Sequence, residues 1–74
     1  MTNPLTTQVG GDHYKSMKVQ PVEFIHGNGI GYLAGNVIKY VSRYKSKNGK
    51  QDLEKARHYI ELLIAAEYPE EPKP

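Results

Sequence analysis

Two short stretches of this chain combine cationic and aromatic side chains in the way that proteins bind phosphorylated ligands. The first, near the start of the chain, begins with two glycines, whose successive N–H groups can form a nest for an anion. A histidine and a lysine add positive charge there, and a tyrosine adds a ring for stacking. The alternative is a loop that its tyrosine fastens to the helices. The candidate ligand residues of this stretch are Gly10, Gly11, His13, Tyr14 and Lys15.

The second stretch has four polar residues at positions i, i+3, i+4 and i+7: Asn36, Lys39, Tyr40 and Arg43. This spacing places them in one stripe on a helix. An amide can recognise a base edge, two cations can bind phosphate and a phenol can stack on a base, so the stripe is a candidate nucleotide site. The alternative is a solvated helix face whose tyrosine packs at an interface.

A third cluster contains Asp52, Lys55, His58 and Tyr59. Here we favour a structural role, in which Asp52 caps its helix and pairs with Lys55. We assign no catalytic residue and no cofactor. The three histidines lack metal-ligand spacing, so we expect no metal site. No P-loop motif is present, and carboxylates for Mg²⁺ are few, which weighs against phosphoryl transfer.

Helices must position these side chains. Apolar residues at helical spacing predict one long helix from about 30 to 44 and another from about 51 to 67. Pro21 suits the start of a short helical turn whose Phe24 and Ile25 would face inward. Gly35 lies inside the first long helix, at a cost of about 1 kcal/mol relative to alanine. Close approach of another helix or a ligand would explain it, and the alternative is that the helix simply tolerates this glycine. The expected core stripe of the second long helix is Leu53, Ala56, Ile60, Leu63 and Ile64.

The remaining segments complete an all-α prediction, a hairpin of two long helices with a helical turn and a structured loop before it. Alternating apolar residues between 17 and 22 suggest a short extended segment before the turn, and Asn28 is a plausible cap after it. Asn48-Gly49 predicts the turn between the long helices. We expect a flexible arm at 1–9, one domain at 10–67 and a disordered tail at 68–74.

Length and composition favour an oligomer. A chain of 74 residues buries only about 60% of its unfolded surface, and it has no cysteine for disulfide bonds. The second long helix also carries more apolar surface than one partner helix covers.

No leader or membrane span is evident, so we expect a soluble protein in a reducing cytoplasm. The net charge is +2, yet residues 39–57 hold seven cations against two carboxylates, which favours an anionic ligand.

Four motifs in order resemble a small bacteriophage family of unknown function whose members are often labelled nucleotide kinase. The motifs are Gly10 to Lys15, Gln20 to Ile25, Gly35 to Arg43, and Lys47 to Tyr59, within a similarity that spans residues 10–64. The resemblance implies nucleotide handling in the host cytoplasm. It also places Lys55 in a family motif, beside the candidates already selected. In size and charge the chain is similar in kind to phage proteins that sequester nucleotide signals of bacterial immunity.

The leading hypothesis is a homo-oligomeric phage protein that binds a phosphorylated or cyclic nucleotide between subunits and sequesters an immune signal. The alternative is a nucleoside monophosphate kinase or another phosphoryl-transfer enzyme. Nucleic-acid binding through residues 39–57 is less favoured, because acidic residues flank that segment and the net charge is small. An interaction protein that targets a host factor also stays open.

Overall fold

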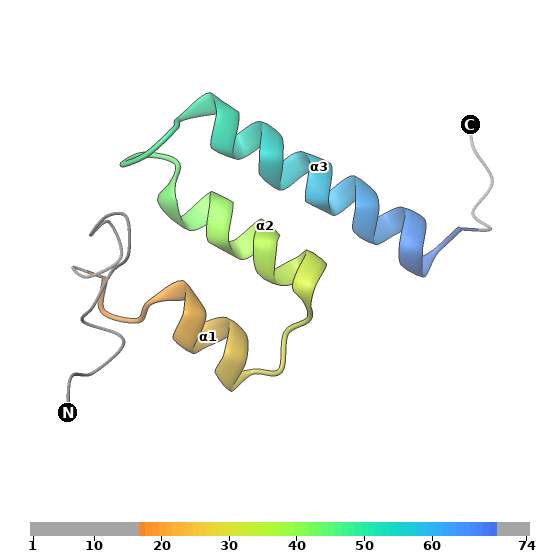
Figure 1. Ribbon diagram of the computed structural model, residues 1–74, viewed down its shortest axis with the longest axis horizontal. Coiled ribbons are helices and arrows are strands. Elements are labelled where there is room, and N and C mark those ends of the chain that lie inside the picture. Colours follow the sequence, from red (N-terminus) through yellow and green to blue (C-terminus); the bar gives the residue numbers. More distant parts are fainter. Residues whose placement is uncertain (1–16, 70–74) are drawn as a thin grey trace.

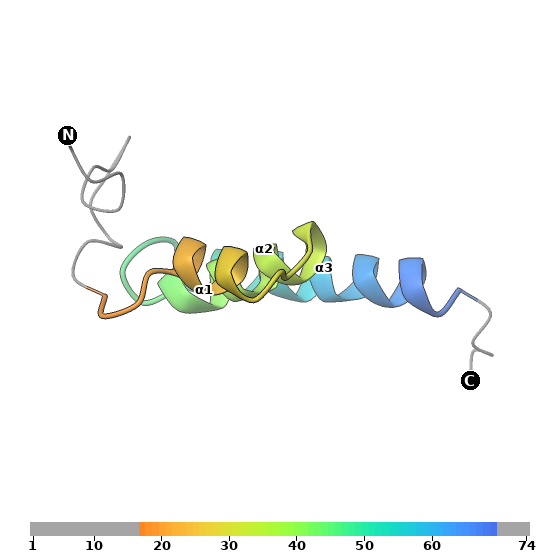
Figure 2. The same cartoon turned by 90° about the horizontal axis from the view of Figure 1, so that it is seen from below.

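The computed structural model describes residues 17–69, which form three helices and no strand: α1 (Pro21–Gly27), α2 (Tyr32–Arg43) and α3 (Lys50–Glu67). The all-α prediction and the helical hairpin are confirmed, since α2 packs along α3. α2 lies between α1 and α3 (Figure 1), and turning the molecule shows that the helices form one layer (Figure 2). The extended segment predicted before α1 was wrong for residues 17–19, which form bends. None of the helices within residues 17–69 is long and apolar enough to cross a membrane.

Local signals at both ends explain why α1 forms although it has only seven residues. Pro21 occupies the first helical position, where its missing N–H costs nothing. The Gln20 N–H donates to Glu23 Oε1 over 2.9 Å, which satisfies one backbone donor at the start. At the other end, Asn28 Nδ2 donates to the Phe24 carbonyl oxygen over 2.8 Å. The predicted capping role of Asn28 is thus confirmed.

The turn between α2 and α3 depends on a glycine. Gly49 has a φ of +54°, a conformation that side chains with a Cβ rarely adopt. In that conformation its N–H donates to the Tyr44 carbonyl oxygen over 2.8 Å, which closes the loop back onto the end of α2. The Asn48-Gly49 turn signal therefore located the reversal of the chain correctly.

Gly35 is where α1 approaches α2. It is buried, and a Cβ built on it would lie 3.0 Å from Ile25 Cγ2. A separation of 3.0 Å is tighter than nine in ten real Cβ contacts, so Ile25 would have to shift to admit a larger residue. Of the three explanations for this interior glycine, contact with another helix is the one the structure supports.

Little of the described chain is buried, and Ala56 is its only fully buried apolar side chain apart from Pro21. Two predictions of inward-facing residues were wrong. Phe24 is 48% exposed, although Ile25 beside it is half-buried. On α3 the inner positions are Asp52, Ala56, Tyr59 and Leu63, whereas Leu53, Ile60 and Ile64 of the predicted core stripe are exposed. α3 therefore turns a partly polar face toward α2 and leaves an apolar stripe outside.

The contact at Gly35 predicts the effect of filling it. Gly35→Val would press two methyl groups against Ile25, and we expect it to lower the free energy of unfolding by about 1–3 kcal/mol. Urea denaturation followed by circular dichroism measures this loss. Ile25→Ala in the same chain should recover part of it, because the second change makes room for the first. Gly27→Val is the control, since no atom lies within 4 Å of its Cβ position; equal losses at both glycines would contradict the contact.

Candidate functional site

A buried ion pair joins the end of α2 to the start of α3. Arg43 Nη2 donates to Asp52 Oδ1 over 3.2 Å, and Arg43 Nε donates to Asp52 Oδ2 over 3.3 Å. The two bonds make a bidentate ion pair, which is the strongest arrangement of a guanidinium with a carboxylate. The Asp52 side chain is 0% exposed and that of Arg43 only 13%. This pair is internal to the protein and fixes how α2 and α3 meet.

Asp52 also stabilises the turn before its own helix. Its Oδ2 accepts the Asn48 N–H over 3.1 Å, which stabilises the turn, but the N-cap of α3 is Gly49, so the predicted cap was wrong. The expected partner Lys55 was wrong, since the cation that pairs with Asp52 is Arg43. Burial raises the pKa of the Asp52 carboxyl, but the hydrogen bonds from Arg43 and Asn48 and the charge of Arg43 lower it more. The net result is a pKa below the ordinary value, so Asp52 is ionised at neutral pH.

Three tyrosine rings meet between α2 and α3. Tyr40 stacks on Tyr59 with ring centroids 5.9 Å apart and an interplanar angle of 17°. Tyr32 meets the same Tyr59 ring edge-on at 6.1 Å and 77°. These are favourable geometries for aromatic pairs. A hydrogen bond with Tyr32, and then burial, raise the pKa of Tyr59, so its phenol stays neutral at physiological pH.

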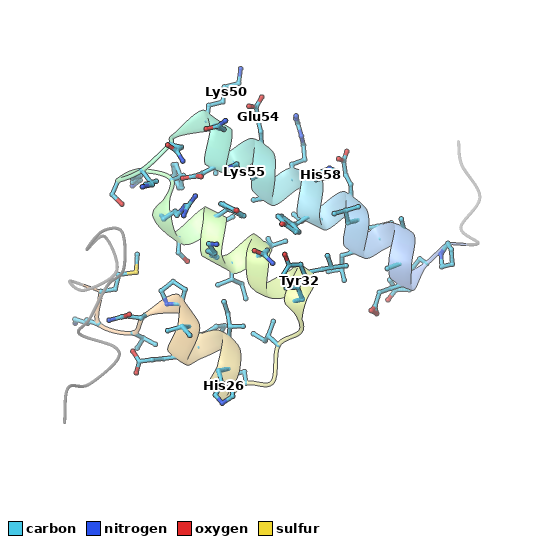
Figure 3. The ribbon with its side chains drawn as sticks, in the orientation of Figure 1. His26, Tyr32, Lys50, Glu54, Lys55 and His58 are labelled. Carbon is cyan, nitrogen blue, oxygen red and sulfur yellow. The ribbon has the colours of Figure 1, made fainter. Side chains whose placement is uncertain are left out.

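Three cations surround the ring of Tyr40. Arg43 Cζ lies 4.7 Å from its centroid, Lys39 Nζ 5.1 Å and Lys55 Nζ 5.3 Å. All three lie within cation–π distance, and they come from two helices. In Figure 3, Lys55 lies on the side of α3 toward α2, whereas Lys50 and Glu54 project away from α2. We call this group the cationic tyrosine cluster: Tyr32, Lys39, Tyr40, Arg43, Lys55 and Tyr59.

Three open grooves among residues 17–69 adjoin the cationic tyrosine cluster. One of them, of about 510 Å³ where α2 begins and α3 ends, meets the cluster only at Tyr32. The α1–α2 groove, of about 310 Å³, is mainly apolar, with Pro21, Ile25 and Ile30 in its lining. Asn36 and Lys39 are its polar contributions from α2. The α2–α3 groove, of about 410 Å³, is lined by Tyr40, Gln51, Glu54, Lys55, His58 and Tyr59. Lys39 thus borders the α1–α2 groove, whereas Tyr40 and Lys55 border the α2–α3 groove.

The structure brings together four of the five candidate residues that it describes. Lys39, Tyr40, Arg43 and Lys55 form one cluster, although Arg43 is largely occupied by Asp52. Asn36 lies in the neighbouring groove, where its Nδ2 donates to the Tyr32 carbonyl oxygen over 2.9 Å. The candidates of the first stretch lie outside the described residues: Gly10, Gly11, His13, Tyr14 and Lys15.

Sequence reasoning missed Tyr32 as part of the site and did not join Tyr59 to Tyr40. One signal was available. Tyr32, Asn36, Tyr40 and Arg43 follow the spacing i, i+4, i+8 and i+11, so Tyr32 extends the polar stripe by one turn. No group of three or more histidine, aspartate or glutamate side chains within residues 17–69 is placed to hold a metal ion. The groups that converge here are cations and phenols, a set that binds anions and planar rings.

Comparison with known proteins identifies a family and nothing closer. Residues 4–61 match the family described as a protein of unknown function, DUF3310. No curated protein and no solved structure matches the chain.

The lowered pKa of Asp52 predicts how stability depends on pH. The ion pair stabilises the fold fully above the unfolded-state pKa, near 4, and its contribution disappears as the pH falls through the lower folded-state pKa. Asp52→Asn should therefore lower the melting temperature at pH 7 and flatten the loss of stability between about pH 5 and pH 2. Thermal denaturation across this range measures both effects. Exposed Glu54→Gln is the control, and the same profile for both variants would contradict the role of the pair.

Proposed function

The chain belongs to the DUF3310 family of proteins of unknown function, and we propose that it binds a phosphorylated nucleotide without converting it. The observation that carries the proposal is the convergence of Lys39, Arg43 and Lys55 on the ring of Tyr40. Cations from two helices gathered at one ring supply the positive charge that the phosphate of a nucleotide needs.

Charge balance within the cluster favours an anionic ligand. Arg43 is compensated by Asp52. Lys39 and Lys55 form no ion pair among residues 17–69, yet both are half-buried beside the same ring. Their nitrogens lie 5.1 and 5.3 Å from the Tyr40 centroid, so a phosphate beside that ring would be attracted by both charges. The two lysines are therefore the proposed phosphate ligands. Arg43 adds positive charge nearby and holds the Tyr40 ring in position.

The α1–α2 groove supports a place for the base. It is apolar enough to cover a planar ring, and its volume lies at the lower end of the range for small-molecule sites. Asn36 at its side uses one of its two amide protons in the bond to Tyr32, which leaves the other proton and the side-chain oxygen for a base edge. Lys39 lies between this groove and Tyr40, so a nucleotide with its base in the groove would direct its phosphate to the cations.

The proposal also covers what encloses the nucleotide site and where the protein acts. The α1–α2 and α2–α3 grooves are both open, so we propose that residues 10–15 and a second copy of the chain complete the site. The resemblance of the motifs to the small phage family supports a viral protein that acts in the host cytoplasm. There it would sequester a nucleotide or cyclic nucleotide that signals in host immunity. Nothing in the cluster calls for nucleic acid or a membrane as its partner.

Isothermal titration with a panel of nucleoside mono-, di- and triphosphates and cyclic nucleotides tests the proposal. At least one should bind, and Lys39→Ala or Lys55→Ala should each weaken that binding about tenfold, roughly 1.4 kcal/mol. Affinity should also fall as the salt concentration rises, because both contacts are ionic. Lys47→Ala removes an equal charge at an exposed position in the turn and should leave binding unchanged.

Two outcomes would overturn this function. If no ligand of the panel gives a binding heat, the proposal that the protein binds a nucleotide is wrong. Formation of a nucleoside diphosphate from ATP, Mg²⁺ and a nucleoside monophosphate would instead establish the kinase alternative, provided that Lys39→Ala abolishes it. A bound nucleotide recovered intact after denaturation is the result that we expect.

A further inference from the structure

We propose that the outer stripe of α3, together with Val41 of α2, is a self-association surface on which a second copy of this chain docks antiparallel to the first. The apolar face consists of Val41, Leu53, Ile60 and Ile64, which are between 42% and 51% exposed. On α3 the three residues are separated by seven and four positions, so they form one stripe along the helix. This inference is independent of the proposed nucleotide function.

The apolar face points away from the cationic tyrosine cluster. Two residues along an α-helix correspond to a rotation of about 200°. Val41 lies two positions from Lys39 and from Arg43, so it projects from the opposite side of α2. Leu53 stands in the same relation to Lys55 on α3. The layer of helices therefore has a charged aromatic side and an apolar side. A copy docked on the apolar side leaves the charged side accessible, so the copy that completes the proposed nucleotide site is a different one.

A second copy fits the size of this face. α3 has 18 residues and is therefore about 27 Å long, and two adjacent helices are about 20 Å wide. The face accordingly offers roughly 500 Å² per copy, about 1,000 Å² in total, which is the area that a biological interface must reach and less than the ~1,200 Å² of the smallest standard ones. The molecule measures only 18 Å across its shortest axis, because its helices form one layer (Figure 2). Domains are normally stable as two packed layers, and a second copy supplies the missing one.

The rest of this chain has too few apolar side chains to cover the face itself. The sixteen residues before the described range contain Met1, Leu5 and Val9 as their large aliphatic side chains, and Tyr14 as their aromatic one. The five residues after it are glutamate, proline and lysine. Three aliphatic side chains among polar residues and glycines offer less apolar surface than a face of four such side chains on two helices.

Charges along α3 favour an antiparallel pair. Its first half carries Lys50, Lys55 and Arg57 against Asp52 and Glu54, a net charge of +1, whereas Glu61 and Glu67 give its second half a net charge of −2. Antiparallel alignment about a two-fold axis sets the basic half of each copy beside the acidic half of the other. Arg57 and Glu61 are both exposed and lie one turn apart at the margin of the apolar stripe. With the axis between them, Arg57 of each copy faces the partner's Glu61.

Sedimentation velocity and native mass spectrometry of the full chain without nucleotide test the docking. The wild type should be a dimer, and Ile60→Asp should weaken dimerisation at least tenfold. Val22→Glu is the control, since Val22 is also exposed but borders the α1–α2 groove. Arg57→Glu should weaken the dimer by repulsion, and the double variant Arg57→Glu with Glu61→Arg should restore it. Circular dichroism confirms that each variant is helical.

A wild-type chain that is monomeric at about 100 µM would overturn the proposal, including the case in which the apolar face is covered by the chain's own first residues. So would dimerisation that Ile60→Asp leaves intact. If the charge exchange fails to restore the dimer, the antiparallel register is wrong. Because nucleotide binding is titrated separately, loss of the dimer and loss of the ligand are distinguishable results.

Discussion

The buried pair of Arg43 and Asp52 is the interaction on which the rest of this structure depends. It joins the last turn of α2 to the first turn of α3, and Asp52 also accepts the Asn48 N–H of the intervening turn. Separating two buried charges is far more costly than separating two apolar side chains, so the pair admits one register of the hairpin. That register stacks Tyr40 on Tyr59 and brings Lys55 of α3 beside Lys39 of α2.

The same pair explains why α3 is oriented as it is. With Asp52 turned inward, the positions four, seven and eleven residues later also face α2, and these are Ala56, Tyr59 and Leu63. Leu53, Ile60 and Ile64 are then necessarily turned outward, although they are the more apolar set. An ion pair and an aromatic stack, rather than apolar burial, decide which side of α3 is inside. The exposed apolar stripe is a direct consequence of that choice.

Much of the fold could be predicted from local signals. Helical spacing located α2 and α3 to within two residues at each end, Asn48-Gly49 located the turn, and Pro21 located the start of α1. The stripe that includes Lys39, Tyr40 and Arg43 was also predicted, because helix geometry alone determines it.

The inner face of α3 was not predicted. Two apolar stripes compete on that helix, and only a contact with α2, between Asp52 and Arg43, distinguishes them. The i+3 spacing of Asp52 and Lys55 suggested that these two residues pair. The guanidinium of Arg43 is the better partner, because it donates two parallel hydrogen bonds to one carboxylate and an ammonium group does not.

The pair also divides the roles of the three cations around Tyr40. Arg43 is fixed by Asp52 and its charge is compensated, so it holds the Tyr40 ring in place rather than binding an external anion with full strength. Lys39 and Lys55 approach the same ring on flexible stems and have no carboxylate among the described residues as an ion-pair partner. An ammonium on such a stem can move toward a phosphate at little cost, whereas a guanidinium in a bidentate ion pair cannot. The cluster therefore consists of a fixed aromatic ring and guanidinium with two adjustable lysines beside them, and in the proposed function the lysines would bind the anion.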